Sequence, residues 1–511
     1  MSKEQHGPFS ELEEATINEL QAAMVSGQLT SQRLTEMYIE RIHALDRSGP
    51  TLRSVIEMNP DALDIAKALD EERQAKGLRG PLHGIPLLLK DNIATLDKME
   101  TTAGSLALVG SRPPRDAFVV QKLREAGAVL LGKANLSEWA NFRSTTSSSG
   151  WSGRGGQTRN PYVLDRTPCG SSSGSAVAIA ANLAAASLGS ETDGSIICPA
   201  TSNGLVGIKP TVGLTSRAGV IPISHSQDTV GPFGRTVADA ALLLGTITGV
   251  DAQDAVTQES TGKFYNDYTQ FLDSDGLRGA RIGVARQTYF GYNSKSDAIA
   301  ESAIKTMRSL GAEIIDPANI ATSEEMAFAD TEMTVLLYEF KADLNAYLAT
   351  LTDTSLHSLA DIIAFNETHA NEELLYFGQE LFMKAQETSS LDDPKYVTAL
   401  AANHRLSRQK GIDAVMNEHR LDALVMPSGG PSWCIDLITG DHTIGGSEQA
   451  AALAGYPLIS VPAGFTFGLP IGITFLGRAY SEPMLIKLAY AFEQATKVRK
   501  APQYLSTTPQ F

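Results

Sequence analysis

The stretch IPLLLK at residues 85–90 is a short, continuous apolar run that ends in a lysine. An apolar run of this length, without polar alternation, is typical of a β-strand that is buried on both faces. A second such run, AVLL at residues 128–131, follows a helical pattern over residues 117–126. The order of helix and strand therefore predicts an α/β fold, with one large parallel or mixed sheet flanked by helices.

The same alternation recurs toward the C-terminus. ARIGVA at residues 280–285 precedes AIKTMRSLGAEII at residues 303–315, and LPIGITFLG at 469–477 precedes PMLIKLAYAFEQ at 483–494. We therefore expect strand and helix to alternate through most of the chain, within one domain that spans residues 1–511.

Two regions are expected to be helical throughout. Residues 10–80 begin with Ser10 and Glu13 at the spacing of a capping box, and apolar side chains then recur at helical intervals: Ile17, Leu20 and Met24, followed by Leu34, Tyr38 and Ile42. The region from about residue 325 to residue 420 contains long amphipathic helical patterns such as SLADIIAFN. We interpret this second region as a helical insertion or lid near the entrance of the functional site.

Composition excludes several classes of protein. Of the 511 residues, 42% are hydrophobic and 20% are charged, which is typical of a globular protein rather than a disordered chain or a membrane bundle. The net charge of −16 argues against nucleic acid as a partner. No apolar run is long enough to predict a transmembrane segment.

The cysteines and the N-terminus bear on location. Three cysteines cannot form a disulfide framework, and an odd count is typical of a reduced compartment. The first residues contain no apolar core of a signal peptide. We therefore expect a cytoplasmic protein as the chain stands, or a periplasmic or secreted one if a leader has been removed.

Two Gly/Ser turns are the candidates for a functional site. PCGSSSGS at residues 168–175 leads into AVAIAANLAAASLG at 176–189, and ETDGS follows at 191–195. The Ala-rich segment predicts a buried helix, whose N-terminal N–H groups suit a developing oxyanion. On this interpretation the two turns bracket the helix and meet at one site. The alternative for residues 141–174 is a flexible linker.

A catalytic serine needs a base, and the sequence offers two kinds. Gly170, Ser172 and Gly174 fit the G-x-S-x-G elbow of α/β-hydrolases, but no strand is predicted before them. The histidines that this elbow requires later in the chain stand in polar surroundings typical of exposed residues: His357, His369, His404, His419 and His442. Lys90 is the other candidate, because burial of its amine would depress the pKa toward neutrality and make it a general base. A lysine that reaches solvent from a strand end is the alternative.

Three blocks of the sequence resemble the core of the amidase signature family. They are GPLHGIPLLLKDNI at residues 80–93, PCGSSSGSAVAIAANL at 168–183, and ETDGSIICPATSNGLVGIKPTVGL at 191–214. Ser195 follows Ser171 by 24 residues and Lys90 by 105 residues, spacings similar to those of the Ser–cis-Ser–Lys triad of that family. Further segments, such as GWSGRGGQTRNPY at 150–162, are similar to members that remove the C-terminal amide of peptides.

The resemblance implies roles for individual residues. Ser195 corresponds to the nucleophile, Ser171 to a bridging serine next to a cis peptide bond, and Lys90 to the base. The oxyanion hole is implied to consist of the turn Thr192, Asp193, Gly194 and Ser195. Asp193 departs from the usual glycine, and what its side chain contributes is left open. No metal or organic cofactor is implied, and the sequence contains no motif for one.

The resemblance thus implies a hydrolase of primary amides, with a small-molecule or peptide amide as substrate and with ammonia and an acyl-enzyme as products of the first step. The alternatives are a broader aryl or aliphatic acylamidase and the amidase subunit of a tRNA-dependent amidotransferase. A thiol amidase that uses Cys169 or Cys198 is a further alternative, although we expect these cysteines to be small packing residues. The sequence leaves the preferred side chain and the oligomeric state open.

Overall fold

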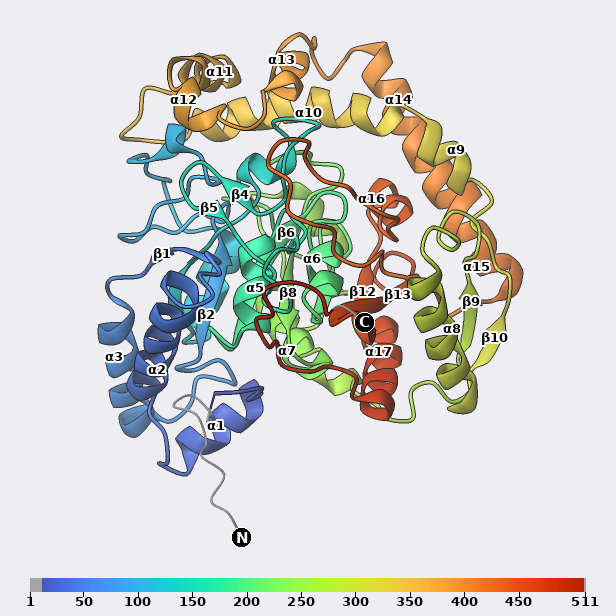
Figure 1. Cartoon of the computed structure of the whole chain (residues 1–511), viewed down its shortest axis with the longest axis horizontal. Coiled ribbons are helices and arrows are strands. Elements are labelled where there is room, and N and C mark those ends of the chain that lie inside the picture. Colours follow the sequence, from blue (N-terminus) through green and yellow to red (C-terminus); the bar gives the residue numbers. More distant parts are fainter. Residues whose placement is uncertain (1–11, 510–511) are drawn as a thin grey trace.

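A computed structural model describes residues 12–509. Its centre is a mixed sheet of eleven strands in the order β1-β3-β2-β6-β8-β7-β12-β13-β11-β9-β10 (Figure 1). The strands are β1 (Val55–Met58), β2 (Pro86–Lys90), β3 (Val129–Ala134), β6 (Ala186–Glu191), β7 (Val206–Lys209), β8 (Thr229–Gly234), β9 (Arg281–Val284), β10 (Glu313–Ile315), β11 (Ala423–Pro427), β12 (Leu458–Thr466) and β13 (Leu469–Leu476). The predicted α/β class and the predicted large mixed sheet are confirmed.

The helices cover the sheet and extend from it. They are α1 (Ile17–Val25), α2 (Ser31–Ile42), α3 (Ala62–Lys76), α4 (Phe118–Glu125), α5 (Ser173–Ala180), α6 (Ile197–Ser202), α7 (Val237–Ile247), α8 (Ser294–Ser309), α9 (Ser323–Phe328), α10 (Thr331–Leu348), α11 (Leu359–Thr368), α12 (Ala370–Glu373), α13 (Glu380–Gln386), α14 (Pro394–His404), α15 (Asp413–His419), α16 (Gln449–Ala454) and α17 (Glu482–Thr496). A separate two-stranded ribbon pairs β4 (Trp151–Ser152) with β5 (Gly156–Gln157). Among the described residues, no helix is both long and apolar enough to cross a membrane.

The buried apolar runs form the middle of the sheet as expected. Every residue of β2, β3, β6 and β8 is buried, because helices lie on both faces of these strands. β2 runs parallel to both of its neighbours, β3 and β6. The carboxyl ends of β2 and β6 therefore lie side by side at one edge, where Lys90 and Glu191 end their strands.

The N-terminal helices follow the predicted apolar spacing. Ile17, Leu20 and Met24 are buried on α1, and the structure has a capping box at Thr16 and Glu19. The capping box predicted from Ser10 depends on a residue outside the described part of the chain. Residues 10–80 are not all helical, since β1 lies between α2 and α3.

One predicted helix is shorter than expected. Residues 176–189 were expected to be helical, but α5 ends at Ala180 and residues 186–191 form β6. Asn182 takes a positive φ of 57°, which ends the helix. The following residues instead complete the sheet, pairing with β2 on one side and β8 on the other. Helix propensity of the Ala-rich segment is thus overridden by the strand pairing that buries it.

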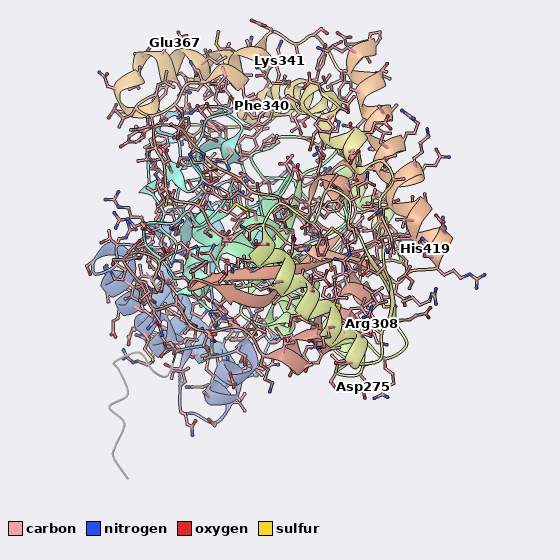
Figure 2. All side chains as sticks on the ribbon, turned by 45° about the vertical axis from the view of Figure 1, so that its right-hand side comes forward. Asp275, Arg308, Phe340, Lys341, Glu367 and His419 are labelled. Carbon is pink, nitrogen blue, oxygen red and sulfur yellow. A yellow bond between two sulfur atoms is a disulfide. The ribbon has the colours of Figure 1, made fainter. Side chains whose placement is uncertain are left out.

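The predicted helical insertion corresponds to α9–α15, which lie along the top and right of Figure 1. It is attached to the sheet domain through an aromatic cluster. Phe340 of α10, labelled in Figure 2, is 1% exposed. It stacks on Phe382 of α13 with ring centroids 5.2 Å apart. Phe382 in turn contacts Trp139 edge-on at 5.6 Å. The insertion therefore packs on the loops that follow β3.

Candidate active site

Lys90 is completely buried at the carboxyl end of β2. Its Nζ lies 2.7 Å from Ser171 Oγ, 2.9 Å from Ser190 Oγ and 3.1 Å from the carbonyl oxygen of Ser190. The alternative in which this lysine reaches solvent is wrong. The structure brings the lysine and the serine of the first turn together across 81 residues of sequence.

The environment of Lys90 favours a neutral amine. Burial lowers the pKa of Lys90 to about 7, and the opposing attraction of Asp228 and Glu191 only partly offsets this. A neutral lysine amine has two N–H groups and one lone pair. The two N–H groups can donate to the carbonyl oxygen and to Oγ of Ser190, and the lone pair can then accept the proton of the Ser171 hydroxyl.

Ser171 lies just before the N-terminus of α5, and the Gly170–Ser171 peptide bond is cis, as the resemblance implied. Ser172 fixes this turn to β6, since its Oγ donates to the Ser190 carbonyl over 3.0 Å. Gly174 permits the close packing of α5, because a Cβ there would lie 2.3 Å from the Ser54 carbonyl oxygen. The turn is therefore held rigidly against the strand that carries Ser190.

The second turn, residues 192–195, lies beside the first. The N–H of Ser172 donates to the carbonyl of Ser195 over 3.3 Å, and Ser195 is 8% exposed. Glu191 holds the far end of the turn by accepting the N–H groups of Ile196 at 2.6 Å and Ile197 at 2.9 Å. The expectation that the two serine turns meet is confirmed, but they meet through α5 and β6 rather than at two ends of one helix.

The turn requires glycine at position 194. Gly194 has a φ of 77°, and a Cβ there would lie 2.7 Å from Glu448 Oε1. Asp193 is not one of the described residues with a positive φ, so the conformational doubt raised by its replacement of glycine does not apply. Burial, followed by the nearby Glu332 and Glu448 carboxylates, raises the pKa of Asp193 well above its usual value.

Acidic and amide side chains link this turn to the insertion. Glu332 of α10 accepts from Gln227 Nε2 at 3.1 Å and from Gln449 Nε2 at 3.0 Å. Gln227 Nε2 also lies 3.4 Å from the carbonyl oxygen of Thr192. The first turn of α10 is thus connected to the candidate oxyanion turn through Gln227 and through the Asp193 side chain, which interacts with Glu332.

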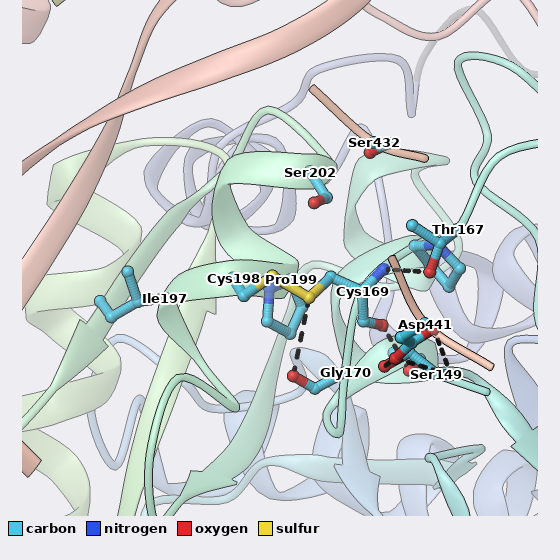
Figure 3. Close-up of a disulfide and its surroundings, with 12 residues drawn as sticks. Ser149, Thr167, Cys169, Gly170, Ile197, Cys198, Pro199, Ser202, Ser432 and Asp441 are labelled. Carbon is cyan, nitrogen blue, oxygen red and sulfur yellow. Dashed lines mark hydrogen bonds between the residues drawn. A yellow bond between two sulfur atoms is a disulfide. The ribbon is translucent and has the colours of Figure 1, made fainter. Parts of the chain in front are cut away.

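The cysteine expectation is wrong. Cys169 and Cys198 form a disulfide with a Cα–Cα distance of 5.8 Å (Figure 3), so neither is a free thiol or only a packing residue. The bond joins the residue two before Ser171 to the residue three after Ser195. The two cysteines are 29 residues apart in the sequence, and they meet only because the chain returns through β6. The sequence pattern alone therefore did not predict their contact. Cys434 is free and exposed.

The hydrolase-elbow alternative receives no structural support. No strand directly precedes Ser172 in the described chain. His357 bonds to Asp361 and Leu348, His369 to the Phe365 carbonyl, and His442 to Thr439 and Asp436. None of these contacts reaches either serine turn.

Two site residues escaped the sequence analysis. Ser190 accepts from Lys90 and from Asn92 Nδ2, which lies 2.9 Å from its Oγ. Asp228 accepts the hydroxyl of Thr192 at 2.6 Å. The only sequence signal for Ser190 is its place beside the second turn, and Asp228 has none, since its role depends on the pairing of β6 with β8.

Comparison with known proteins agrees with this geometry. The model of the Amidase family matches residues 33–486. The chain belongs to the amidase signature family. A peptide amidase from Stenotrophomonas maltophilia is 53% identical, with a TM-score of 0.93 and coverage of 97% of this chain and 100% of that one. This amidase is therefore close in structure to peptide amidase.

More distant relatives span the same length. A probable amidase of Arabidopsis thaliana is 47% identical over 504 residues, covering 97% of this chain and 92% of its own length. A glutamyl-tRNA(Gln) amidotransferase subunit of Halorhodospira halophila is 33% identical over 506 residues, covering 96% of this chain and 99% of its own length. The relatives thus include both proteins named as amidases and amidotransferase subunits.

Proposed function

We propose that this amidase hydrolyses primary amides through an acyl-enzyme, with Lys90 as the base, Ser171 as the proton relay and Ser195 as the nucleophile. The observation that carries the proposal is the 2.7 Å contact between the buried Lys90 amine and Ser171 Oγ, with the Ser195 turn alongside. A serine hydroxyl is a weak nucleophile until a neighbouring base takes its proton.

The proposed mechanism moves one proton from Ser195 through Ser171 to Lys90. Neutral Lys90 accepts the proton of Ser171, and Ser171 accepts that of Ser195 as the Ser195 oxygen attacks the amide carbonyl. We assign stabilisation of the resulting oxyanion to N–H groups of the turn 192–195. The Glu191 carboxylate accepts the N–H groups of Ile196 and Ile197 and also interacts with that of Gly194. The proton returns through Ser171 to the departing nitrogen, which leaves as ammonia. Water then hydrolyses the acyl-enzyme by the same relay.

The substrate proposed is the C-terminal amide of a peptide. Support comes from the 53% identity to peptide amidase over nearly the whole of both chains, against 33% to the amidotransferase subunit. The connection of α10 to the Thr192 turn through Gln227 and Glu332 supports an insertion that borders the entrance. A broad acylamidase is the alternative within the same mechanism.

The experiment is ammonia release by the purified chain from a panel of N-acylated peptide amides, short acyl amides and anilides. We expect peptide amides to be turned over fastest and the corresponding acids to accumulate. Lys90→Met should abolish release. Lys133→Met is the matched control, because Lys133 is equally buried and its amine donates to the Ile93 carbonyl and to Thr101 rather than to either serine turn. Release that survives in Lys90→Met, or no release from any amide, would contradict the proposal.

The disulfide bears on location. Structural disulfides persist in oxidising compartments, so Cys169–Cys198 favours the periplasmic or secreted alternative over the cytoplasmic one. Fractionation of the source cells, with alkylation of free thiols before lysis, tests this: labelling of Cys434 alone is expected, and labelling of all three cysteines would contradict it.

A further inference from the structure

Asp228 is a buried carboxylate, 8% exposed, that none of the proposed chemical steps uses. Its Oδ1 accepts the hydroxyl of Thr192 over 2.6 Å. Its Oδ2 accepts the N–H groups of Ile223 at 2.8 Å and Ser224 at 3.0 Å. The Asp228 carboxylate thus joins the two ends of the loop 223–228 by hydrogen bonds and also binds Thr192, the first residue of the candidate oxyanion turn.

The loop 223–228 is itself held from the other side. Glu339 of α10, which is fully buried, accepts from Ser224 Oγ at 2.5 Å and from the N–H and Oγ of Ser226 at 3.0 Å each. The loop is therefore fixed between α10 and the turn that carries Ser195. A carboxylate placed at this junction determines where Thr192, and with it the turn, sits relative to Ser171.

Asp228 also acts on Lys90 by its charge. Two negative groups face the Lys90 amine, Glu191 from the end of β6 and Asp228 from the loop before β8, and both favour the ammonium form. The cation that faces Asp228 is Arg217, and burial raises the pKa of Asp228 to about 6. Removing the Asp228 charge therefore leaves Lys90 easier to deprotonate.

We infer that Asp228 is a positioning residue for the amide hydrolysis: its hydrogen bond to Thr192 sets the oxyanion turn, and its carboxylate sets the charge balance at Lys90. This inference rests on the proposed function of Lys90 and Ser195. It separates two effects that one residue exerts, and each effect has its own measurable consequence.

The rate test uses the full chain, a neutral N-acylated peptide amide, three single variants and one double variant. Thr192→Val removes the hydroxyl and keeps the shape, whereas Thr192→Ser retains the donor. We expect Asp228→Ala and Thr192→Val each to lower kcat by about 10- to 100-fold, the range for one hydrogen bond to a charged group, with KM changed by less than about threefold. The double variant should be no slower than the slower single variant, and Thr192→Ser should restore most of the rate.

The pH profile separates positioning from a general loss of stability. Asp228→Asn should move the acid limb of kcat/KM to lower pH by about half a unit or more, while Thr192→Val leaves its midpoint in place. Asp239→Asn is the matched control, since Asp239 is also buried and accepts a backbone N–H, that of Ile17 at 2.9 Å. It should lower the melting temperature without moving kcat or the profile. If Asp228→Ala does not fold, the pH profile of Asp228→Asn and the rates of Thr192→Val and Thr192→Ser still test the inference.

The outcomes that overturn the inference are distinct. A Lys90-dependent turnover that Asp228→Ala and Thr192→Val leave within about twofold of wild type would overturn the inference alone, as would an acid limb that Asp228→Asn does not move. Multiplication of the two losses in the double variant would also overturn it, because the residues would then act independently. No turnover of any amide by the wild type would overturn the proposed function and, with it, the role of Asp228.

Discussion

The pH dependence of turnover tests the state of Lys90. Burial lowers the pKa of its amine from 10.5 to about 7, and only the neutral amine accepts a proton. At pH 5 the neutral fraction is about one part in 100, so kcat/KM is expected to fall about 100-fold between pH 8 and pH 5, by about tenfold per pH unit in the lower part.

The assay is the initial rate of ammonia release from an N-acylated peptide amide without ionisable groups, so that the substrate does not titrate. The competing titrating groups near the site are carboxylates. Burial raises the pKa values of Asp228 and Glu448 to about 6 and about 7, and it also raises those of Asp193 and Glu191. Temperature separates them from Lys90. Amine ionisation is strongly endothermic and carboxyl ionisation is not, so the midpoint should move to lower pH on warming. A profile that is flat to pH 5, or a midpoint that temperature does not move, would refute the assignment of the base.

Three further predictions concern the same region. Ser195→Ala should lose ammonia release by at least about 1000-fold and form no covalent adduct with an activated ester, as read by intact mass; an adduct on the variant would place the nucleophile elsewhere. Lys90→Met should raise the melting temperature at pH 7 by about 2 °C while abolishing activity. The reason is that a lysine whose pKa is lowered in the folded state destabilises that state most below about pH 7, and this destabilisation decreases only as the pH rises toward 10.5. A variant that melts at a lower temperature than wild type would contradict the burial argument. The double variant Cys169→Ser/Cys198→Ser should have a free energy of unfolding about 3 kcal/mol lower than wild type, as measured by denaturant titration. Cys434→Ser should leave this free energy unchanged. Equal stability of the wild type and both variants would mean that the disulfide does not form.

Local sequence predicted the parts of the site that depend on continuous patterns. The apolar run before Lys90 is a buried strand, and Gly174 and Gly194 stand where the backbone approaches other groups too closely for a Cβ. The expected helix over residues 176–189 failed because strand pairing, a long-range effect, overrides the propensity of an Ala-rich segment.

The sequence analysis did not predict the contacts between segments that are distant in the chain. Asp228 reaches Thr192 only because β6 and β8 are antiparallel neighbours. The Cys169–Cys198 disulfide likewise follows from the return of the chain through α5 and β6, which no spacing rule encodes. The family resemblance supplied the positions of Lys90, Ser171 and Ser195, but not the residues that contact this group, such as Ser190 and Asp228.

The central claim is that the Lys90 amine loses its proton near neutral pH inside the protein, rather than near pH 10.5. Selective ¹³C labelling of lysine side chains, with the Lys90 signal assigned from the Lys90→Met spectrum, measures this by the chemical shift of its Cε as pH is varied. The account predicts a titration with a midpoint near pH 7. A midpoint above about pH 10, in the range of exposed lysines, would contradict it.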